Sequence, residues 1–313
     1  MGGGRGLSHQ PDLFAGSPGR RRKERAVRAL LSSAAFVSLA VSVAIVLALF
    51  GQAVSWLTRV DLGELWGDGW FPRQGGFDVL TLVLGTLLFA GIAMLVAAPL
   101  GLGAAIYLSE FATPRVRRVL KPVLETLAGI PSVVLGYFAL TVIQPELVQR
   151  LFTTRTGAFS FLAAGIAVRI LTVPLVASVA EDALFAVPGA LREAAYGIGA
   201  RRATVAIRVA FPAAISGIVA SLILGLSRAV GETMVVAIAA GATGQALRTF
   251  NPLDGGQTMT GAISSLAIGS DQVKGSGLAF GSLYFIGLVL FVVTFALNVA
   301  SERFVRRVRG AHR

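Results

Sequence analysis

The sequence lacks cysteine entirely and contains two histidines, His9 and His312, among its 313 residues. Without cysteine, disulfides and thiolate metal sites are excluded. Both histidines lie near the chain ends, so no histidine is available inside an apolar segment as an acid, a base or a metal ligand. The composition therefore disfavours an enzyme that works within the apolar part of the chain, because most nucleophile–base pairs and metal sites need these side chains.

Charged residues are also scarce: they make up 14% of the chain against 55% apolar residues, and the mean hydropathy is +0.75. A soluble domain carries about a quarter charged residues. The net charge of +12 could suggest a nucleic-acid partner, but the basic residues lie at the ends of apolar runs instead of in one cluster. The pattern indicates a protein in contact with membrane lipid and predicts no nucleic-acid partner.

Six apolar runs are long enough to cross a bilayer, which takes about 20 residues at a rise of about 1.5 Å each. They are residues 29–51, 79–108, 119–143, 159–179, 213–240 and 280–300. The first run follows a basic cluster but is too long for the apolar region of a signal peptide, so we interpret it as a retained anchor. The sequence thus predicts an all-α membrane protein with six transmembrane helices.

Lysine and arginine are distributed asymmetrically between the predicted loops. With the N-terminus inside, the cytoplasmic segments hold 20 of them and the outer loops hold six. The segments are 1–28, 109–121, 180–213 and 301–313, and the outer loops are 52–78, 144–158 and 241–277. Because cytoplasmic loops carry such an excess, we expect both termini in the cytoplasm.

The topology divides the chain into four parts. Residues 1–28 and 303–313 form basic cytoplasmic tails, and the first is expected to be disordered because it has little to bury. Residues 29–78 contain the first transmembrane helix and an outer loop, and residues 79–302 form the core. Within the last outer loop, the apolar run 259–268 is too short to span the bilayer and is expected to be a surface or re-entrant helix.

The longest predicted cytoplasmic loop contains a short helix. Pro188 suits its start and Gly199 suits its end. Between them, residues 192–195 read Arg-Glu-Ala-Ala. The two alanines permit close approach of a partner, and the charged residues can form ion pairs across an interface. The alternative is an ordinary amphipathic loop helix.

This loop resembles the pattern Glu-Ala-Ala-x3-Gly-x9-Ile-x-Leu-Pro, which marks the permease subunits of bacterial ABC importers. Val209 and Phe211 replace the Ile and Leu of that pattern conservatively. The resemblance implies the MetI-like permease fold and a coupling helix at about 188–200 that sits in a groove of an ATP-hydrolysing subunit. It also implies an ATPase-coupling role for residues in and after the loop, namely Arg192, Glu193, Ala194, Ala195, Gly199 and Pro212.

A nucleotide-hydrolysing motor is not apparent in the sequence. A phosphate-binding loop needs Gly-x4-Gly-Lys followed by Ser or Thr, but Lys23, Lys121 and Lys274 follow Arg, Leu and Val. We expect a transport subunit that has no ATPase site and no metal site and binds no cofactor itself. ATP and Mg would be used by a partner ATPase.

The fifth apolar run contains two ionisable residues, Arg228 and Glu232. At a spacing of four they share a face of a continuous helix and can pair. Charges at mid-membrane cost at least a few kcal/mol and usually face a water-filled path. One interpretation is a structural ion pair. The other is that Arg228 binds an oxyanion with its planar guanidinium, and that Glu232 neutralises it when the path is empty.

Residues 228–234, Arg-Ala-Val-Gly-Glu-Thr-Met, resemble a segment of the PstC family of phosphate-specific permeases. Residues 125–134, 193–199 and 290–295 resemble the same family in the same order. The sister family, PstA, shares the Arg…Gly-Glu-Thr core but typically continues with Ala-Pro, so Met234 favours PstC. The resemblance implies import of inorganic phosphate, with the Arg and Glu of this segment required.

The same resemblance implies the partners and the location. We expect a second permease subunit (PstA-like), a dimer of ATP-binding subunits (PstB-like) and a phosphate-binding protein (PstS-like). The chain would cross the bacterial cytoplasmic (inner) membrane several times. The substrate pathway would contain Arg228, Glu232 and Thr233.

Two further residues are candidates for the pathway. Arg169 lies where the family is usually uncharged, so it could be a second anion contact, a partner for a carboxylate of the other permease, or a residue that reaches towards the interface. Ser132 follows Pro131, whose ring interrupts helical hydrogen bonding. Irregular backbone at membrane depth is tolerated where it lines a cavity, although a simple packing kink explains this position equally well.

There are four alternatives to this function. The chain could be a permease for another oxyanion or a small solute, or the sister phosphate permease. An intramembrane enzyme is disfavoured because no carboxylate pair at helical spacing occurs in a predicted span. A passive channel is disfavoured because it would not need the Glu-Ala-Ala loop.

Overall fold

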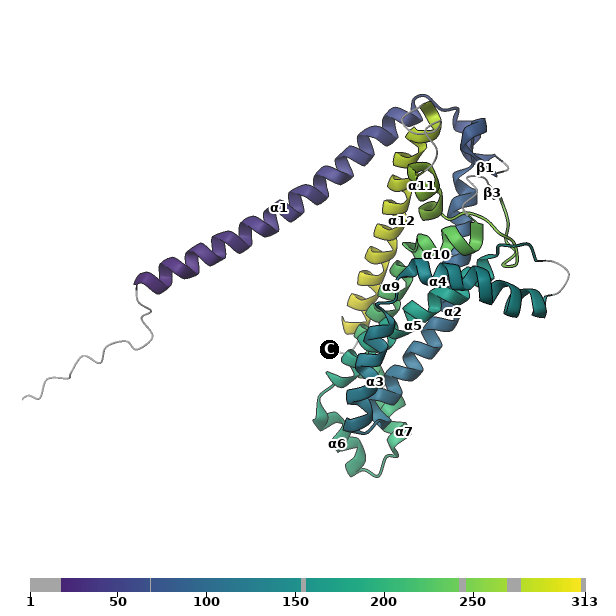
Figure 1. Cartoon of the computed structure of the whole chain (residues 1–313). Helices are drawn as coiled ribbons and strands as arrows, with labels where there is room; N and C mark the ends of the chain where they lie inside the picture. The colour runs from purple at the N-terminus through teal and green to yellow at the C-terminus, as the bar shows by residue number, and fades with distance from the viewer. Residues whose placement is uncertain (1–17, 68, 153–155, 242–245, 269–276, 311–313) are drawn as a thin grey trace, which may run out of the picture. The chain divides into compact units, whose positions relative to one another are not determined.

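The computed structural model of the chain describes residues 18–67, 69–152, 156–241, 246–268 and 277–310 (Figure 1). The chain divides into two compact units, Met1–Leu49 and Phe50–Arg313. The first unit contains most of helix α1, and the second contains all the other elements.

Helix α1, Pro18–Leu57, includes the first predicted span and is longer than expected. Disorder was predicted for residues 1–28, and for residues 18–28 that prediction is wrong because they are helical. Arginine and lysine are good helix formers, so the basic cluster continues the helix in front of the apolar run. Residues 1–17 lie outside the described part of the chain.

Three helices form the centre of the second unit: α2, Val79–Ile106, α5, Phe161–Phe185, and α9, Ile215–Val230. They pack against one another along their lengths (Figure 1). The Asp78 carboxylate accepts hydrogen bonds from two backbone N–H groups in the first turn of α2, and the Ser160 hydroxyl accepts one in α5. These caps satisfy backbone donors that have no partner within the helix.

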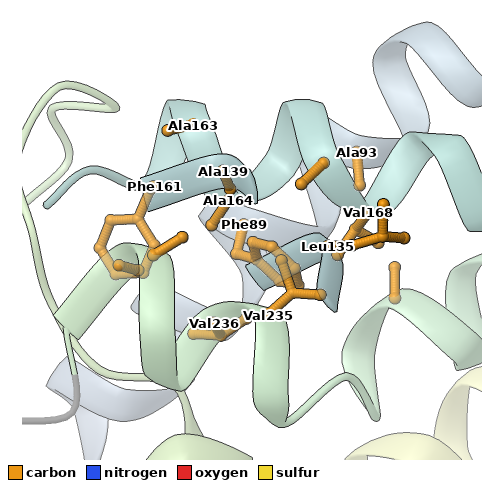
Figure 2. Close-up of a cluster of buried hydrophobic side chains, with 14 of the residues drawn as sticks. Phe89, Ala93, Leu135, Ala139, Phe161, Ala163, Ala164, Val168, Val235 and Val236 are labelled. Atoms are coloured by element: carbon orange, nitrogen blue, oxygen red, sulfur yellow. The ribbon is translucent and has the colours of Figure 1, made fainter. Parts of the chain in front are cut away.

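The core of this bundle is filled by apolar side chains from several helices. Phe89 of α2, Phe161 of α5 and Val235, which follows α9, are buried in one cluster (Figure 2). Lipid tails are as apolar as these side chains, so the association depends on close packing. Each van der Waals contact contributes little energy, but a buried side chain makes dozens of these contacts.

Small residues let α9 approach α5 closely. A Cβ atom at Gly217 would lie 2.3 Å from Cβ of Ala183, and one at Gly225 would lie 2.7 Å from Cγ2 of Val176. Ser221, between them, is fully buried. The small residues on this face of α9 therefore pack within the chain, against α5.

We expect Gly225→Leu to destabilise the protein, because its side chain would overlap Val176 and Thr172. Overpacking of this kind typically costs about 1–3 kcal/mol, which lowers the thermal unfolding temperature of the detergent-solubilised protein. Gly91→Leu in α2 is the matched control, because no atom lies within 4 Å of a Cβ there. Equal unfolding temperatures for the two variants would contradict the close packing.

The third span differs from the prediction of one helix over 119–143. Helix α3, Pro114–Leu127, ends before Pro131, and a separate helix, α4, Ser132–Phe138, continues as the π-helical segment η4, Ala139–Gln149. Proline lacks the N–H group for helical bonding, and α3 has a charged face that suits an interface rather than a bilayer core. The apolar span is Ser132–Gln149.

The fifth span is also broken, so the prediction of a continuous helix over 213–240 is wrong. Residues 231–233 are not helical, and the chain resumes as α10, Met234–Val236, and the π-helical segment η6, Ala237–Gly241. Before α9, the chain bends by 75° between Arg202–Ala213 and Ile215–Val230. Irregular backbone at this depth is tolerated where it is buried in protein or lines a water-filled path.

A small antiparallel sheet departs from the expected all-α structure. Strands β1, Gly69–Phe71, β2, Gly76–Phe77, and β3, Ala246–Leu247, pair in the order β2-β1-β3. Trp70 of β1 and Phe77 of β2 are paired in it, and both are buried. Arg248, which follows β3, forms a 2.8 Å ion pair with the buried Asp78 carboxylate, so the sheet is fixed to the start of α2.

The remaining helices complete the second unit. Short 3-10 turns, η1, Leu62–Trp66, and η2, Pro72–Gln74, flank the first strand. Helix α11, Met259–Ile268, is the short apolar helix that the sequence predicts there, and α12, Gly277–Gly310, contains the last span. Within the described residues, five helices are long and apolar enough to cross a membrane, or six with the bent pair counted as one.

Candidate functional site

Arg228 lies in the last turn of α9, inside the fifth span. Its side chain is exposed in this chain and makes no ion pair or hydrogen bond with any residue that the structure describes. A guanidinium within a spanning segment is costly unless water, a ligand or another chain solvates it. The geometry therefore leaves this charge accessible to a molecule outside the chain.

Glu232 lies beyond the end of α9, in the break between the helices, and its residue is 7% exposed. Its carboxylate accepts a 3.3 Å hydrogen bond from the backbone N–H of Val235, at the start of α10. The break removes the i,i+4 geometry that would bring it to Arg228, and the two side chains form no ion pair. The interpretation as a structural ion pair is therefore wrong for this chain, although both residues border the same break.

The start of α11 holds this break in place, which the sequence did not reveal. The Thr260 hydroxyl donates a 2.8 Å hydrogen bond to the backbone carbonyl of Glu232 and lies 2.9 Å from the Thr258 hydroxyl. The backbone N–H of Met259 donates to the Thr86 hydroxyl of α2. The sequence signal was a pair of threonines, Thr258 and Thr260, at the start of a short apolar helix. These contacts connect α2, α11 and the break.

Of the other predicted pathway residues, Thr233 lies in the break and Ser132 lies on a helix that contacts α10. Thr233 is half-buried and its hydroxyl donates to the Gly231 carbonyl at 3.3 Å. Ser132 begins α4, and Gly136 in the next turn packs directly on the backbone of α10. Arg169, on α5, is half-buried and makes no ion pair or hydrogen bond with described residues. The structure therefore brings α4 and the break together and leaves the role of Arg169 a prediction.

The predicted loop helix is present as α6, Gly189–Gly197. It ends in a glycine motif: Gly199 has a φ angle of 82°, and the N–H of Ala200 donates to the carbonyl of Ala195 at 3.1 Å. The N–H of Gly199 donates to the carbonyl of Tyr196. This Schellman geometry needs a left-handed residue, which explains the glycine at this position.

Most of the predicted coupling residues lie on the accessible surface of this loop. Glu193 and Ala194 are exposed on α6, and so is Pro212 in α8, Phe211–Ala213. Ala195 points inward and is 8% exposed. Between α6 and α8 the chain forms α7, Arg202–Val205, and the π-helical segment η5, Ala206–Ala210.

Arg192 does not have the surface position that was expected for an interfacial ion pair. Its guanidinium binds Glu110, with Nη2 2.8 Å from Oε1, and donates to the carbonyls of Leu184 and Val187. Glu110 is 6% exposed at the end of the second span. Arg192 is therefore engaged within its own chain, and sequence reasoning missed Glu110 because the two residues are far apart along the chain.

Residues 97–310 match the family described as binding-protein-dependent transport system inner membrane component. The chain belongs to this family. It is thus a permease of an ABC importer, a multi-pass inner-membrane component whose family implies an ATPase and a substrate-binding protein as partners.

Several named proteins are similar to this chain along most of its length. The chain is 30% identical to the phosphate transport system permease protein PstC of Pasteurella multocida over 88% of this chain and 89% of that one. It is 33% identical to PstC of Haemophilus influenzae, over 77% and 79%. It is also 31% identical to the probable ABC transporter permease protein YqgH of Bacillus subtilis, over 92% and 93%.

Solved structures with the same fold support the architecture. An inward-facing MetNI methionine ABC transporter matches with a TM-score of 0.55 at 18% identity, over 72% of this chain and 93% of that chain. A bacterial ABC transporter involved in the import of alginate matches with a TM-score of 0.58 at 14% identity, over 92% and 99%. At these identities the likeness shows the fold alone, and it confirms the MetI-like permease architecture.

Proposed function

We propose that this chain is the permease subunit of an ATP-driven importer that carries inorganic phosphate across the cytoplasmic membrane. The observation that carries the proposal is Arg228, whose guanidinium has no partner among the described residues and lies in the last turn of a spanning helix, beside a break in that helix. The names of the PstC relatives support it, since they match along most of the chain.

The chemistry of Arg228 suits phosphate. Its guanidinium presents a planar fork of N–H donors that matches two oxygens of a tetrahedral oxyanion and stays charged at every physiological pH. Glu232 contributes negative charge to the same break while its carboxylate is held by the Val235 N–H. Repulsion between this carboxylate and a bound anion limits the affinity, which a transport site needs because the ion must leave as well as bind.

The proposal extends to the remaining parts of the importer. A PstS-like binding protein would deliver phosphate, a PstA-like chain would complete the path, and a PstB-like ATPase dimer would engage the exposed surface of α6. ATP and Mg would act in that ATPase, and this chain would bind no cofactor. Within the described residues, no group of three or more His, Cys, Asp or Glu could hold a metal ion.

Competitive uptake in cells tests the substrate. We expect a strain that has this importer as its phosphate transporter to accumulate radiolabelled phosphate. Unlabelled sulfate or molybdate should compete at least about tenfold more weakly than unlabelled phosphate, a difference of about 1.4 kcal/mol in binding free energy. The relative named only as a probable ABC transporter permease makes another solute the second candidate. Uptake that sulfate or molybdate blocks as well as phosphate does would support a general oxyanion permease instead.

A further inference from the structure

The helix α6 is held to the bundle by few buried side chains. Among the residues of α6, Ala195 is the one that is buried. Its exposed residues face away from the chain, so packing alone provides little resistance to a pivot of the helix. A different kind of contact must fix its orientation relative to the spanning helices.

Arg192 supplies that contact through three acceptors outside α6. Its Nη1 and Nη2 atoms donate to the carbonyls of Val187 and Leu184 at 2.6 and 2.7 Å. Its Nε and Nη2 atoms reach both oxygens of Glu110. Leu184 lies in the last turn of α5 and Val187 lies just after that helix, so one side chain contacts both the end of α5 and the end of the second span.

Glu110 lies in the π-helical segment η3, Tyr107–Phe111, which continues α2. π-Helical turns insert a residue into the helical ladder and are frequent at functional sites. The carboxylate is buried, binds the Arg192 guanidinium and accepts a 3.1 Å hydrogen bond from the Ser109 hydroxyl. A buried carboxylate without its cation would be strongly unfavourable, so the ion pair between Arg192 and Glu110 should be maintained.

A second group of charges extends the same connection to α3. The Lys121 ammonium binds the carboxylates of Glu181 and Asp182 on α5, and Arg117 forms an ion pair with Glu181 that lacks hydrogen-bond alignment. Arg117 also lies 3.8 Å over the ring of Phe185. Burial acts to lower the pKa of Lys121, but its hydrogen bonds to the two carboxylates outweigh that effect and raise the pKa, so it stays charged at neutral pH.

We propose that Arg192 is a positioning residue that makes α6, α3 and the adjoining ends of α2 and α5 move as one body. The movement of an ATPase bound to α6 would then be transmitted to the spanning helices by the pair with Glu110. We expect lysine to be a poor replacement for arginine here, because its three donors share one nitrogen, whereas the guanidinium spreads its donors over three nitrogens that reach separate acceptors. The inference rests on the proposed function in one respect, the attachment of the motor at α6.

Coupling measurements on the assembled importer test the role. With Arg192→Lys and Glu110→Gln, we expect the ATPase to co-purify at normal stoichiometry and to hydrolyse ATP, while the solute moved per ATP falls about tenfold. A purely structural defect would lower hydrolysis and transport together. Arg150→Gln is the control, because its pair with Glu146 is exposed. Unchanged transport per ATP in both variants would overturn the role of Arg192.

A distance measurement tests the same inference without any variant of the pair and without phosphate. Because the chain has no cysteine, Ala190→Cys and Tyr107→Cys place two unique spin labels at exposed positions on α6 and at the end of the second span. We expect the same distance in the nucleotide-free and ATP-trapped importer. A change of about 5 Å, roughly one helical turn, would show that the elements move separately and would overturn the inference. Failure of phosphate uptake alone would affect the proposed function and leave this result standing.

Discussion

Replacing Arg228 by alanine is expected to abolish phosphate uptake while the importer still assembles. The guanidinium is exposed in this chain and unpaired within the described residues, so its removal breaks no contact inside the fold. Hydrogen bonds to charged groups contribute about 1.5–3 kcal/mol each, and loss of a two-fold contact with phosphate predicts a fall in uptake on the order of 100-fold or more. The measurement is initial-rate uptake of radiolabelled phosphate at matched membrane levels of the importer.

Two further variants make this result specific. Arg228→Lys keeps the charge but not the planar fork, so it should retain a small part of the activity. Arg150→Ala removes an exposed arginine from an i,i+4 pair and should leave uptake unchanged. If Arg228→Ala transports phosphate normally in a fully assembled complex, the role assigned to Arg228 is wrong.

The combined variant Glu193→Ala, Gly199→Pro is expected to lose the ATPase subunit on purification. Gly199 has a φ angle of 82°, whereas proline is restricted to about −65°, so the terminating turn of α6 cannot form. Glu193 is exposed and forms no hydrogen bond or ion pair with the residues that the structure describes. Together we expect a loss of at least about 2 kcal/mol in association, or roughly 30-fold in affinity.

Co-purification with a tagged ATPase, followed by ATP hydrolysis in detergent, measures this loss. Gly197→Ala is a suitable control, because that glycine lies within α6, has no atom near the position of a Cβ and has no left-handed φ angle. Retention of the ATPase with full coupled activity in the double variant would count against α6 as the attachment site.

The features that the sequence predicted well depend on local chemistry. The helix α6 follows from a proline before it and a glycine after it, and the structure adds that Gly199 is the left-handed residue of the cap. The short apolar helix α11 has the predicted bounds, Met259–Ile268. Both depend on residues within one or two turns, where side-chain and backbone preferences act directly.

The features that the sequence did not predict depend on contacts between distant segments. The apolar residues 213–240 predict a continuous fifth span. The break at Glu232 is instead held by the Thr260 hydroxyl, which comes from another helix. Likewise Arg192 suggested an interface, but Glu110, 82 residues away, occupies its guanidinium. Hydropathy cannot identify such partners, because it describes each run separately.

The break in the fifth span changes the meaning of its two charges. On one continuous helix, Arg228 and Glu232 would neutralise each other and explain their own presence in the membrane. In the structure the Glu232 carboxylate accepts a hydrogen bond from the backbone N–H of Val235, across the break. The charge of Arg228 is therefore not neutralised by Glu232. Because the two residues are separated, a structural ion pair does not explain why Arg228 lies in a spanning segment. A guanidinium with no partner among the described residues needs one from outside the chain, which points to a functional role.

The most direct test is ATP-driven uptake by purified importer in proteoliposomes that contain this chain, its partner permease, the ATPase and the binding protein. We predict that radiolabelled phosphate accumulates inside when ATP is supplied, and that accumulation is lost with Arg228→Ala while the ATPase remains bound. Accumulation of a different solute, with no uptake of phosphate and no stimulation of ATP hydrolysis by it, would contradict the account.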